Sequence, residues 1–470
     1  MRRLEIMWQS FKRKFIGDRA FYRYILRLAI PMIIQNAVTN FVSFLDNIMV
    51  GQIGTEQMSG VAIVNQLIFV FNLCIFGGVS GAGIFGTQYY GKGDYEGQKY
   101  AFRFKLYIGI AASTAALLLF GMRGTELISL YLSDTGSVGD IGLALRFGEK
   151  YLAIMMLGLA PYALGQIYIS SIRETGQTFV PMVASATAVA VNLVLDYVLI
   201  FGPGPVPALG VEGAAIATVI ARFAECFLVV IWTHRNPDKN PYIVGAYRSF
   251  TMPRKVFKDI FIKGMPLLVN ELLWASGITV VVQCYAVRGL EVVAAQNIST
   301  TITNLFNIFY MQLGGCISIV IGQLLGAGKV EEAKEKVVKI LFFTVACGGL
   351  LGSSMALFGQ YFPELYNTEP EIKMLAKQFI VIAALAMPLF SFCHGSYFTL
   401  RSGGRTGITF LFDCGFTWGI MIPVACVLVN FTDIPIVLVF LCVQSTEIIK
   451  VVLGFFMVRS GIWIQNIVED

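Results

Sequence analysis

Twelve long apolar stretches run through this chain of 470 residues, and they restrict its fold more than any other feature. A helix needs about 20 residues to cross about 30 Å of hydrocarbon, so each stretch is long enough to span a bilayer. The runs are continuous, whereas the strands of a membrane barrel would alternate apolar and polar residues. With 56% hydrophobic and 14% charged residues, the chain is a polytopic membrane protein and not a soluble globule. The predicted spans are approximately 25–50, 58–86, 98–120, 146–170, 177–201, 211–233, 259–287, 292–322, 336–358, 374–399, 406–429 and 435–457.

The second half of the chain repeats the first. Residues 31–93 align with residues 266–328 without an insertion or deletion, and a proline, Pro31 or Pro266, begins each copy. Duplicated halves are typical of transporters that alternate access around a site inside or between the repeats. We therefore predict an all-α membrane protein with twelve transmembrane helices, arranged as two pseudo-symmetric six-helix bundles around a central cavity.

Lysine and arginine are distributed very unevenly between the two sides of the predicted membrane. Of the 35, 28 fall in the N-terminal tail, the loops after even-numbered spans, the C-terminal end or the span ends next to them, and six fall on the opposite side. By the positive-inside rule, the side with 28 is cytoplasmic and both termini face the cytosol. The net charge of +6 thus reflects membrane topology and does not require a nucleic-acid partner.

The same reasoning divides the chain into five parts. The first residues alternate basic and aromatic side chains, a pattern typical of an amphipathic segment lying on the inner leaflet of the bilayer. The predicted parts are a cytoplasmic amphipathic N-terminal segment (1–24), an N-lobe with helices 1–6 (25–233), a cytoplasmic linker (234–258), a C-lobe with helices 7–12 (259–458) and a cytoplasmic tail (459–470).

Motifs that suggest an enzyme fail on their context. Gly81, Gly83 and Gly86 match a dinucleotide-binding pattern, but that pattern requires a strand leading into a helix, and here it ends an apolar span. The nine cysteines include no C-x-x-C pair, and only two histidines are present, which disfavours a zinc site or a Ser-His-Asp triad. We expect no catalytic activity and no cofactor.

Polar residues at membrane depth are the strongest functional signal, because a buried charge there is costly and usually has a role. Asp46 and Asp196 each lie a few residues before the outer end of a span, at matching depth. Asn192 is one helical turn before Asp196, and Thr218 falls near the same level of the sixth span. Two carboxylates with an amide and a hydroxyl suit Na⁺, or H⁺ if burial and a like-charged neighbour favour protonation. The alternative is that each aspartate only fixes helix packing through hydrogen bonds.

The second half does not repeat these acids. Val281 aligns with Asp46, and Val424 falls at about the position of Asp196. Instead, Asn270 and Glu271 lie near the middle of the seventh span, where they are candidates for an ion or substrate contact or for a helix-pairing hydrogen bond. A polar run in the eighth span has helical spacing and is expected to face the central cavity; the alternative is that half of it only holds helices together. Its candidate contacts are Gln296, Asn297, Thr300 and Asn304.

Three further polar residues are weaker candidates. His394, in the tenth span, suits either a proton relay or packing against a neighbouring helix. Asp413 lies in the eleventh span and Glu447 in the twelfth. Lys450 follows Glu447 by less than one helical turn, a spacing that permits a structural ion pair.

Several of these segments resemble the multidrug and toxic compound extrusion (MATE) family, and the likeness covers essentially the whole chain. They are the run from Pro31 to Asp46-Asn47-Ile48-Met49-Val50-Gly51, the run Asn192-Leu193-Val194-Leu195-Asp196, the stretch from Gly210 to Thr218, and the loop Arg173-Glu174-Thr175-Gly176-Gln177-Thr178. The resemblance implies that Asp46, Asn192, Asp196 and Thr218 form an N-lobe cation site. It also implies that the first helix bends at Pro31.

The expected function is therefore secondary active export of amphipathic, cationic organic compounds in exchange for H⁺ or Na⁺ by alternating access. A lipid-linked oligosaccharide or lipid flippase of related architecture is one alternative, although the spans lack a basic cavity for a pyrophosphate head group. A channel or sensory membrane receptor is the second alternative. We expect a monomer in the plasma membrane of a prokaryote, with small-molecule substrates, the lipid bilayer as its partner, and no nucleic acid.

Overall fold

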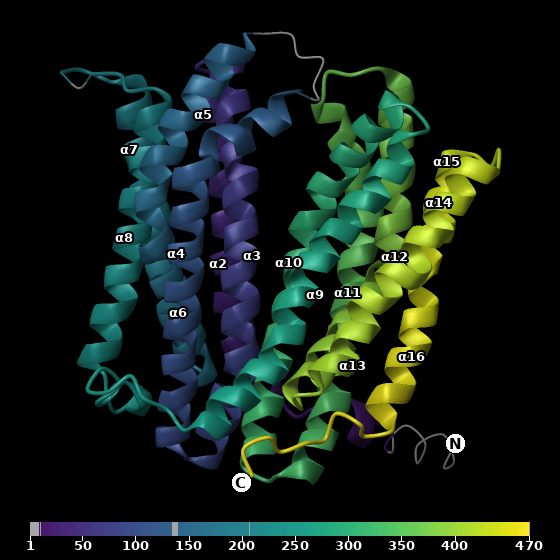
Figure 1. The fold of residues 1–470 in the computed structure, drawn as a ribbon. Helices are drawn as coiled ribbons and strands as arrows, with labels where there is room; N and C mark the ends of the chain where they lie inside the picture. The colour runs from purple at the N-terminus through teal and green to yellow at the C-terminus, as the bar shows by residue number, and fades with distance from the viewer. Residues whose placement is uncertain (1–8, 10, 134–139, 206, 470) are drawn as a thin grey trace. The chain divides into compact units, whose positions relative to one another are not determined.

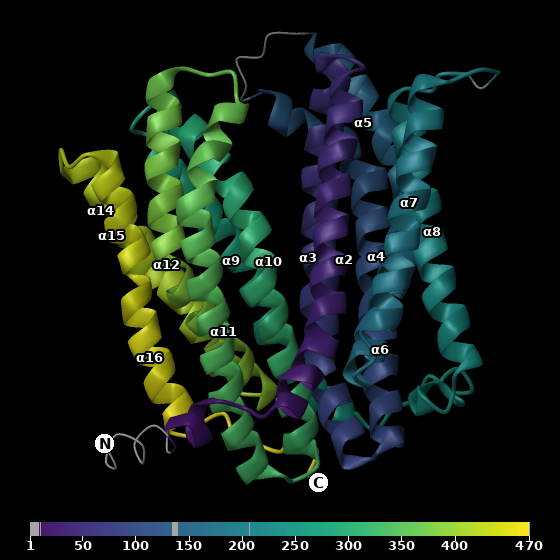
Figure 2. The ribbon, with the colours of Figure 1, turned by 180° about the vertical axis from the view of Figure 1, so that it is seen from behind.

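The computed structural model describes residues 9, 11–133, 140–205 and 207–469, so the predicted N-terminal segment lies partly outside the described residues. The described chain is helical throughout, and twelve of its helical segments are long and apolar enough to cross a membrane. The predicted all-α membrane fold is confirmed. The helices are α2 (Arg19–Gly51), α3 (Thr55–Lys92), α4 (Tyr95–Ser133), α5 (Ile141–Met155), α6 (Leu159–Glu174), α7 (Phe179–Phe201), α8 (Val211–Arg235), α9 (Arg254–Ala286), α10 (Leu290–Gly326), α11 (Val330–Phe358), α12 (Pro370–Ser402), α13 (Thr406–Phe410), α14 (Ile422–Phe431), α15 (Ile436–Ser445) and α16 (Glu447–Arg459), as Figures 1 and 2 show from opposite sides.

Several of the spans consist of more than one helical segment. A 3₁₀ turn, Met156–Gly158, joins α5 to α6 in the fourth span. In the eleventh span, the turns Leu411–Gly415 and Thr417–Met421 are π-helical and lie between α13 and α14. The twelfth span is α15 followed by α16. Because π-helical turns inside helices are rare and often mark functional positions, Asp413 lies in an unusual segment.

The chain forms two compact units. Unit 2 comprises Ile34–Gly86 and Tyr95–Gly264, and unit 1 comprises Met1–Ile33, Thr87–Asp94 and Met265–Asp470. The first turns of α2 therefore pack with the second half of the chain. Their side chains Ile25, Leu28 and Met32 are buried in one cluster with residues of α10, α11 and α12. The boundary inside α2 falls just after Pro31, and the boundary inside α9 falls just before Pro266.

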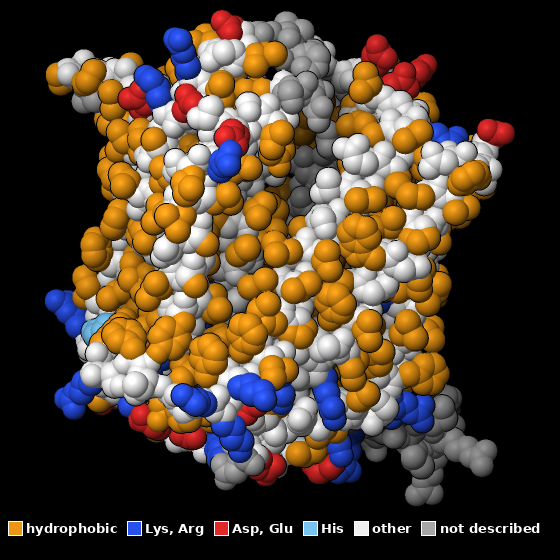
Figure 3. Space-filling model, viewed as in Figure 1, with side chains coloured by type: hydrophobic (Ala, Val, Ile, Leu, Met, Phe, Trp, Pro, Cys, Tyr) orange, Lys and Arg blue, Asp and Glu red, His pale blue; other side chains and the backbone are white. Residues whose placement is uncertain are grey.

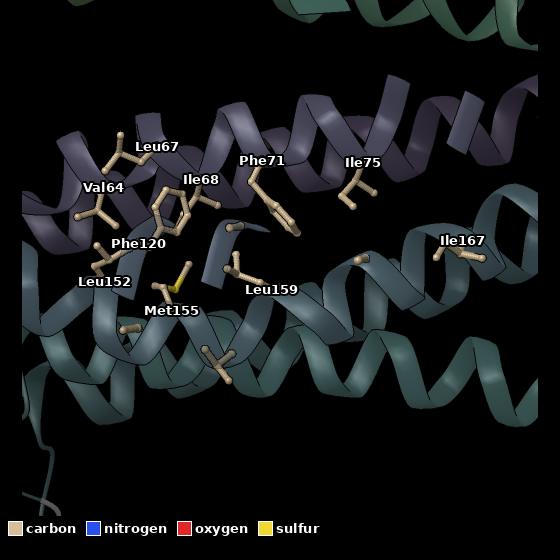
Figure 4. Packing of buried hydrophobic residues seen from close by; sticks show 14 of the residues in the cluster. Val64, Leu67, Ile68, Phe71, Ile75, Phe120, Leu152, Met155, Leu159 and Ile167 are labelled. Carbon is tan, nitrogen blue, oxygen red and sulfur yellow. The ribbon is translucent and has the colours of Figure 1, made fainter. Parts of the chain in front are cut away.

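Apolar side chains fill unit 2 along the inner faces of its helices. Figure 4 shows Phe71 and Ile75 of α3 turned toward Leu159 and Ile167 of α6. On the outer flanks, large apolar side chains remain exposed, and Figure 3 shows them across the visible flanks of the helices, with lysine and arginine gathered mainly toward one end. An apolar exterior with charged ends is the pattern expected of helices surrounded by lipid.

The segment that joins α8 to α9 is a folded part of unit 2. Arg103 of α4, only 5% exposed, donates three hydrogen bonds to carbonyls of this segment, at Ala246 (2.9 Å), Thr251 (3.0 Å) and Gly245 (3.1 Å). Tyr242 is fully buried, and this burial raises the pKa of its hydroxyl well above the ordinary value. The segment is thus held by a buried arginine and a buried tyrosine.

The end of the chain is docked in unit 1. Trp463 is 1% exposed and packs in the cluster that contains the first turns of α2. The side-chain amide of Gln88 donates to the carbonyls of Ser402 (2.9 Å) and Gln465 (3.2 Å) and accepts from the backbone N–H of Ile467 (2.9 Å). Residues 460–469 are therefore bound to the last turns of α3 through a fully buried glutamine.

Candidate functional site

Four side chains that the sequence placed at one depth lie together in unit 2. Asp46 comes from α2, Asn192 and Asp196 from α7, and Thr218 from α8. The carboxyls of Asp46 and Asp196 are direct neighbours, and the Asn192 side chain adjoins Asp196. Asp196 is 1% exposed and Asn192 is 7% exposed, whereas Asp46 and Thr218 are partly accessible. The site is thus buried on the α7 side and reachable from the sides of α2 and α8.

The two carboxyls lack the hydrogen bonds that would merely fix helix packing. Neither oxygen of Asp196 has a partner at normal hydrogen-bond geometry among the described residues, and the same holds for Oδ1 of Asp46 and Nδ2 of Asn192. Buried polar atoms are usually satisfied, so such a group of unsatisfied atoms indicates a place for a ligand. This geometry supports the ion-binding interpretation of these aspartates over the purely structural one.

A tyrosine that the sequence analysis did not identify belongs to the same cluster. Tyr151 of α5 is 4% exposed and interacts with Asp46, Asp196 and Thr218. Its hydroxyl donates to Oδ1 of Asn65 on α3 at 3.4 Å. Nothing in the spacing of the sequence singles out Tyr151, because the contact depends on how α5 packs between α3 and α8.

The donor set determines which ligands the cluster suits. It combines two carboxylates, an amide oxygen, a hydroxyl and a phenol, all of which are hard oxygen ligands. Across the described residues, no group of three or more His, Cys, Asp or Glu is arranged to hold a metal ion. A pair of acids with neutral oxygens around it suits a monovalent cation or a proton better than a zinc-type ion.

A second polar chain in unit 2 begins one turn after Pro31. Arg173 donates to Oε1 of Gln35 at 2.5 Å, and Nε2 of Gln35 donates to the Ser185 hydroxyl at 2.5 Å. The Ser185 hydroxyl in turn donates to Glu225. These bonds connect α6, α2, α7 and α8, so the part of α2 beyond the proline is fixed by polar contacts on the unit 2 side. Whether α2 bends at Pro31 stays a prediction, because α2 is one continuous helix here.

Unit 1 holds a different polar cluster, built around Asn270 and Glu271 of α9. The amide of Asn270 donates to Asp413 at 3.0 Å and to the Tyr397 hydroxyl at 3.4 Å. Tyr397 donates to Glu271 at 3.3 Å, and Nη1 of Arg401 lies 3.9 Å from the same carboxylate. Asp413, a separate candidate in the sequence, therefore forms one cluster with Asn270 and Glu271.

The ion pair that the spacing of Glu447 and Lys450 permits is not formed in the structure; Lys450 has another partner. Lys450 forms an ion pair with Asp413, at 2.8 Å between Nζ and Oδ1, and Glu447 is only an electrostatic neighbour. The reason is that the π-helical turn carries Asp413 toward α16, where it meets the ammonium group directly. A partner from another helix cannot be inferred from spacing along one helix.

His394 and the polar run of α10 make no hydrogen bond to the acids among the described residues, although His394 is an electrostatic neighbour of Asp413. His394 donates from Nδ1 to the Phe390 carbonyl at 3.1 Å and packs on the Tyr310 ring, with 4.8 Å between ring centroids. In the polar run of α10, Asn297, Thr300 and Asn304 are exposed and Gln296 is partly buried. Among the described residues, no hydrogen bond joins this run to Asn270 or Glu271.

The positions in unit 1 that align with Asp46 and Asp196 are apolar. Val281 is 6% exposed, and Val424 packs against the same hydrophobic cluster. The duplicated half thus has a packed core where unit 2 has its acid pair.

Comparison with known proteins agrees with the duplicated architecture. The family model MatE matches the chain twice, over residues 31–198 and 266–432. A probable multidrug resistance protein NorM of Thermotoga maritima is 20% identical over 450 residues, covering 93% of this chain and 92% of the relative. The corresponding protein of Geobacillus kaustophilus is 24% identical and covers 87% and 89%, and a FAD transporter of Shewanella oneidensis is 24% identical and covers 77% and 78%.

Solved structures share the fold. An outward-facing multidrug resistance MATE family transporter superposes with a TM-score of 0.84 at 19% identity, covering 95% of this chain and 96% of that one. The Vibrio cholerae MATE transporter VcmN in its bent form gives a TM-score of 0.82 at 17% identity, covering 95% and 99%. The two family matches together span well over half of the chain. The protein therefore belongs to the MatE family of multidrug efflux transporters, and it is a multi-pass membrane transporter and not an enzyme.

Proposed function

We propose that this protein is a secondary active exporter of amphipathic, cationic organic compounds, which it exchanges for H⁺ or Na⁺ by alternating access. The observation that carries the proposal is the acid pair Asp46 and Asp196, whose buried oxygens lack protein partners. The coupling ion binds there, with Asn192 and Thr218 as neutral ligands and Tyr151 beside them.

Exchange occurs because the ion and the substrate favour different states of the carrier and so do not stay bound together. With the carrier open to the outside, the ion neutralises the acid pair and favours release of the cationic substrate. After the carrier turns inward and the ion leaves, the restored negative charge favours the next substrate. Only differential affinity for the two states can shift such an equilibrium. Pro31 provides the place where α2 yields, because proline cannot donate the hydrogen bond that a regular helix needs at that position.

The orientation is part of the proposal. Both termini and the segment between α8 and α9 face the cytosol of a prokaryotic cell, because the lysines and arginines gather on that side. The exposed polar run of α10 and the apolar walls offer contacts to substrate without strong selectivity, as is usual in ligand cavities.

The test is uptake of a fluorescent organic cation into inverted membrane vesicles, with Na⁺ and pH gradients imposed separately. Wild-type protein should accumulate the cation under at least one gradient, and Asp196→Asn should abolish accumulation while inserting and folding normally. The matched control is Asp433→Asn, which removes an exposed carboxylate from the loop before α15. Normal accumulation by Asp196→Asn would contradict the proposal. Parallel loading with FAD tests whether this chain also carries the cargo of its Shewanella relative.

A further inference from the structure

The acid cluster of unit 1 contains its own positive charges. Asp413 is occupied at both oxygens: Oδ1 pairs with the Lys450 ammonium at 2.8 Å, and Oδ2 accepts from the Asn270 amide at 3.0 Å. The Lys450 side chain is 8% exposed and that of Asp413 is 14% exposed, so the pair is shielded from solvent. A metal ion at Asp413 would have to share these oxygens with the ammonium and the amide.

The ammonium group is held firmly in this place. Nζ of Lys450 lies 5.4 Å from the Phe412 ring centroid and 5.5 Å from that of Phe416, within the range of cation–π attraction. Glu447, 3% exposed, is a second acid in the electrostatic range of the same ammonium, and its Oε2 has no hydrogen-bond partner among the described residues. One lysine therefore serves two buried carboxylates and two aromatic rings.

Within the described part of the chain, the acid pair of unit 2 differs from the acids of unit 1 in lacking a positively charged partner. Among the described residues, neither Asp46 nor Asp196 forms an ion pair, and both oxygens of Asp196 and Oδ1 of Asp46 are unsatisfied. In unit 1, Asp413 has Lys450, and Glu271 has Arg401 at 3.9 Å together with the Tyr397 hydroxyl. A charge tethered by its own side chain is always present at its partner, so a free ion would have to displace it at a high effective concentration.

We propose that Lys450 is a built-in counter-ion of Asp413 and Glu447, which takes the place that a transported cation would otherwise occupy in unit 1 and so confines ion exchange to the Asp46–Asp196 pair. The proposal rests on the proposed ion-coupled function and adds which half performs the coupling. It also implies a latent site: without the ammonium, Asp413, Glu447 and the Asn270 oxygen would present two acids and an amide, which resembles the donor set of unit 2.

The experiment tests for this latent site in a background where Asp196→Asn has disabled the ion site of unit 2. Purified Asp196→Asn protein is compared with the double variant D196N/K450Q, and the thermal unfolding midpoint of each is measured in NaCl and in choline chloride of equal ionic strength. A ligand that binds only the folded state raises its stability by RT ln(1 + c/Kd), where c is the free ligand concentration. We expect Na⁺ to raise the midpoint of the double variant progressively with concentration and to leave that of Asp196→Asn unchanged. D196N/K450R, which keeps a cation in place, should behave like Asp196→Asn. Equal Na⁺ responses of D196N and D196N/K450Q would overturn the proposal.

A second variant guards against loss of folding when the lysine is removed alone. The neutral pair D413N/K450Q replaces both charges with amides of similar size that can still hydrogen-bond. If ion exchange is confined to Asp46 and Asp196, this variant should fold and retain ion-driven export with the wild-type number of ions per substrate. A folded D413N/K450Q protein with a changed ion stoichiometry would refute the assignment. The Na⁺ measurement does not depend on transport, so its failure is distinguishable from failure of the proposed exporter function.

Discussion

Buried charged residues in this protein fall into two kinds, those with a partner in the protein and those without. Lys105 of α4 has partners: its fully buried ammonium group pairs with Glu174 and donates to the hydroxyls of Ser171 (2.9 Å) and Ser170 (3.2 Å). Glu174 in turn lies against Gly86, where a Cβ atom would collide with the carboxylate. The charges of Lys105 and Glu174 are compensated within the protein, and we infer that this pair stabilises the fold.

Removing the lysine should show how much this group contributes. Lys105→Met leaves the Glu174 charge buried and uncompensated, which costs about 3–5 kcal/mol in a typical buried pair. Lys99→Met is the matched control, because Lys99 of the same helix pairs with the exposed Glu96, and exposed pairs contribute about 0–1 kcal/mol. The thermal midpoints of the purified variants measure the difference. Equal loss in both variants would show that Lys105 and Glu174 are not a stabilising pair.

The acid pair of unit 2 should respond to its neighbouring phenol. Tyr151→Phe keeps the ring and removes the hydroxyl that interacts with Asp46, Asp196 and Thr218. One lost hydrogen bond corresponds to about 1 kcal/mol, and therefore to a roughly fivefold weaker affinity for the coupling ion. The ion concentration that gives half-maximal export measures this change. An unchanged half-maximal concentration would separate Tyr151 from the ion site.

For single residues, the sequence predicted the candidate ion site of unit 2 but not the neighbouring Tyr151. Asp46, Asp196 and Thr218 could be grouped because depth in a span follows from counting residues to its end. Tyr151 could not be found in this way, because aromatic residues are common in apolar spans and only helix packing selects one. The ion pair of Lys450 could not be predicted for a related reason: its partner, Asp413, lies on a different helix.

The helices approach most closely where glycine is present. The ends of α3 and α10 cross at Gly91 and Gly326, and a Cβ atom on either glycine would collide with the backbone of the other helix, at Gln323 and Gln88 respectively. These glycines are partners in the internal repeat, so the same contact occurs twice in symmetric form. The repeat pairs the two glycines in the sequence, but their close crossing emerges only from the structure.

An alanine at this crossing should separate the helices. Gly326→Ala forces the backbones apart, and overpacking of this kind typically costs about 1–3 kcal/mol. Gly349→Ala in α11 is the control, because open space surrounds that position and alanine favours a helix over glycine by about 1 kcal/mol. The thermal midpoint should fall for the first variant and hold or rise for the second. A Gly326→Ala protein as stable as wild type would contradict the close crossing.

The docked end of the chain is a second feature of this scale. Trp463→Ala removes a ring that is 1% exposed, and the loss of such a side chain costs about 3–5 kcal/mol. Ile462→Ala, at a position that is 38% exposed, serves as the control and should change stability little. Limited proteolysis should then cut residues 460–469 faster in Trp463→Ala. No change in protection would mean that the tryptophan does not hold this segment.

From the sequence, residues 460–469 could be predicted only as part of a tail, because ten residues without a repeated pattern give no sign of docking.

For the whole molecule, the number of spans and the duplication followed directly from the sequence. Length and composition are enough to predict transmembrane helices, because in lipid every backbone N–H and C=O group must find its hydrogen-bond partner within the helix. The assignment of Met1–Ile33 to unit 1 was not accessible in this way. Chain order suggests that the first helix belongs to the first bundle, and only packing shows that its first turns join the other unit.

The proposed orientation makes a direct prediction at this scale. In a background without the nine native cysteines, a cysteine at the exposed Asp433 should react with a membrane-impermeant maleimide on intact cells. A cysteine at the exposed Lys239 should react only after permeabilisation, because the proposed orientation places the segment between α8 and α9 in the cytosol. Labelling in the reverse pattern would invert the topology and the direction of transport.

The central claim is that the coupling ion passes through Asp46 and Asp196 in exchange for substrate. The most direct measurement is substrate-driven ion flux in proteoliposomes that start without an ion gradient, with H⁺ and Na⁺ movements followed by separate indicators. We predict that an imposed gradient of organic cation drives one of these ions in the opposite direction with wild-type protein and with D413N/K450Q, and that Asp46→Asn and Asp196→Asn abolish this flux. Substrate-driven ion flux of wild-type size through Asp196→Asn would contradict the account.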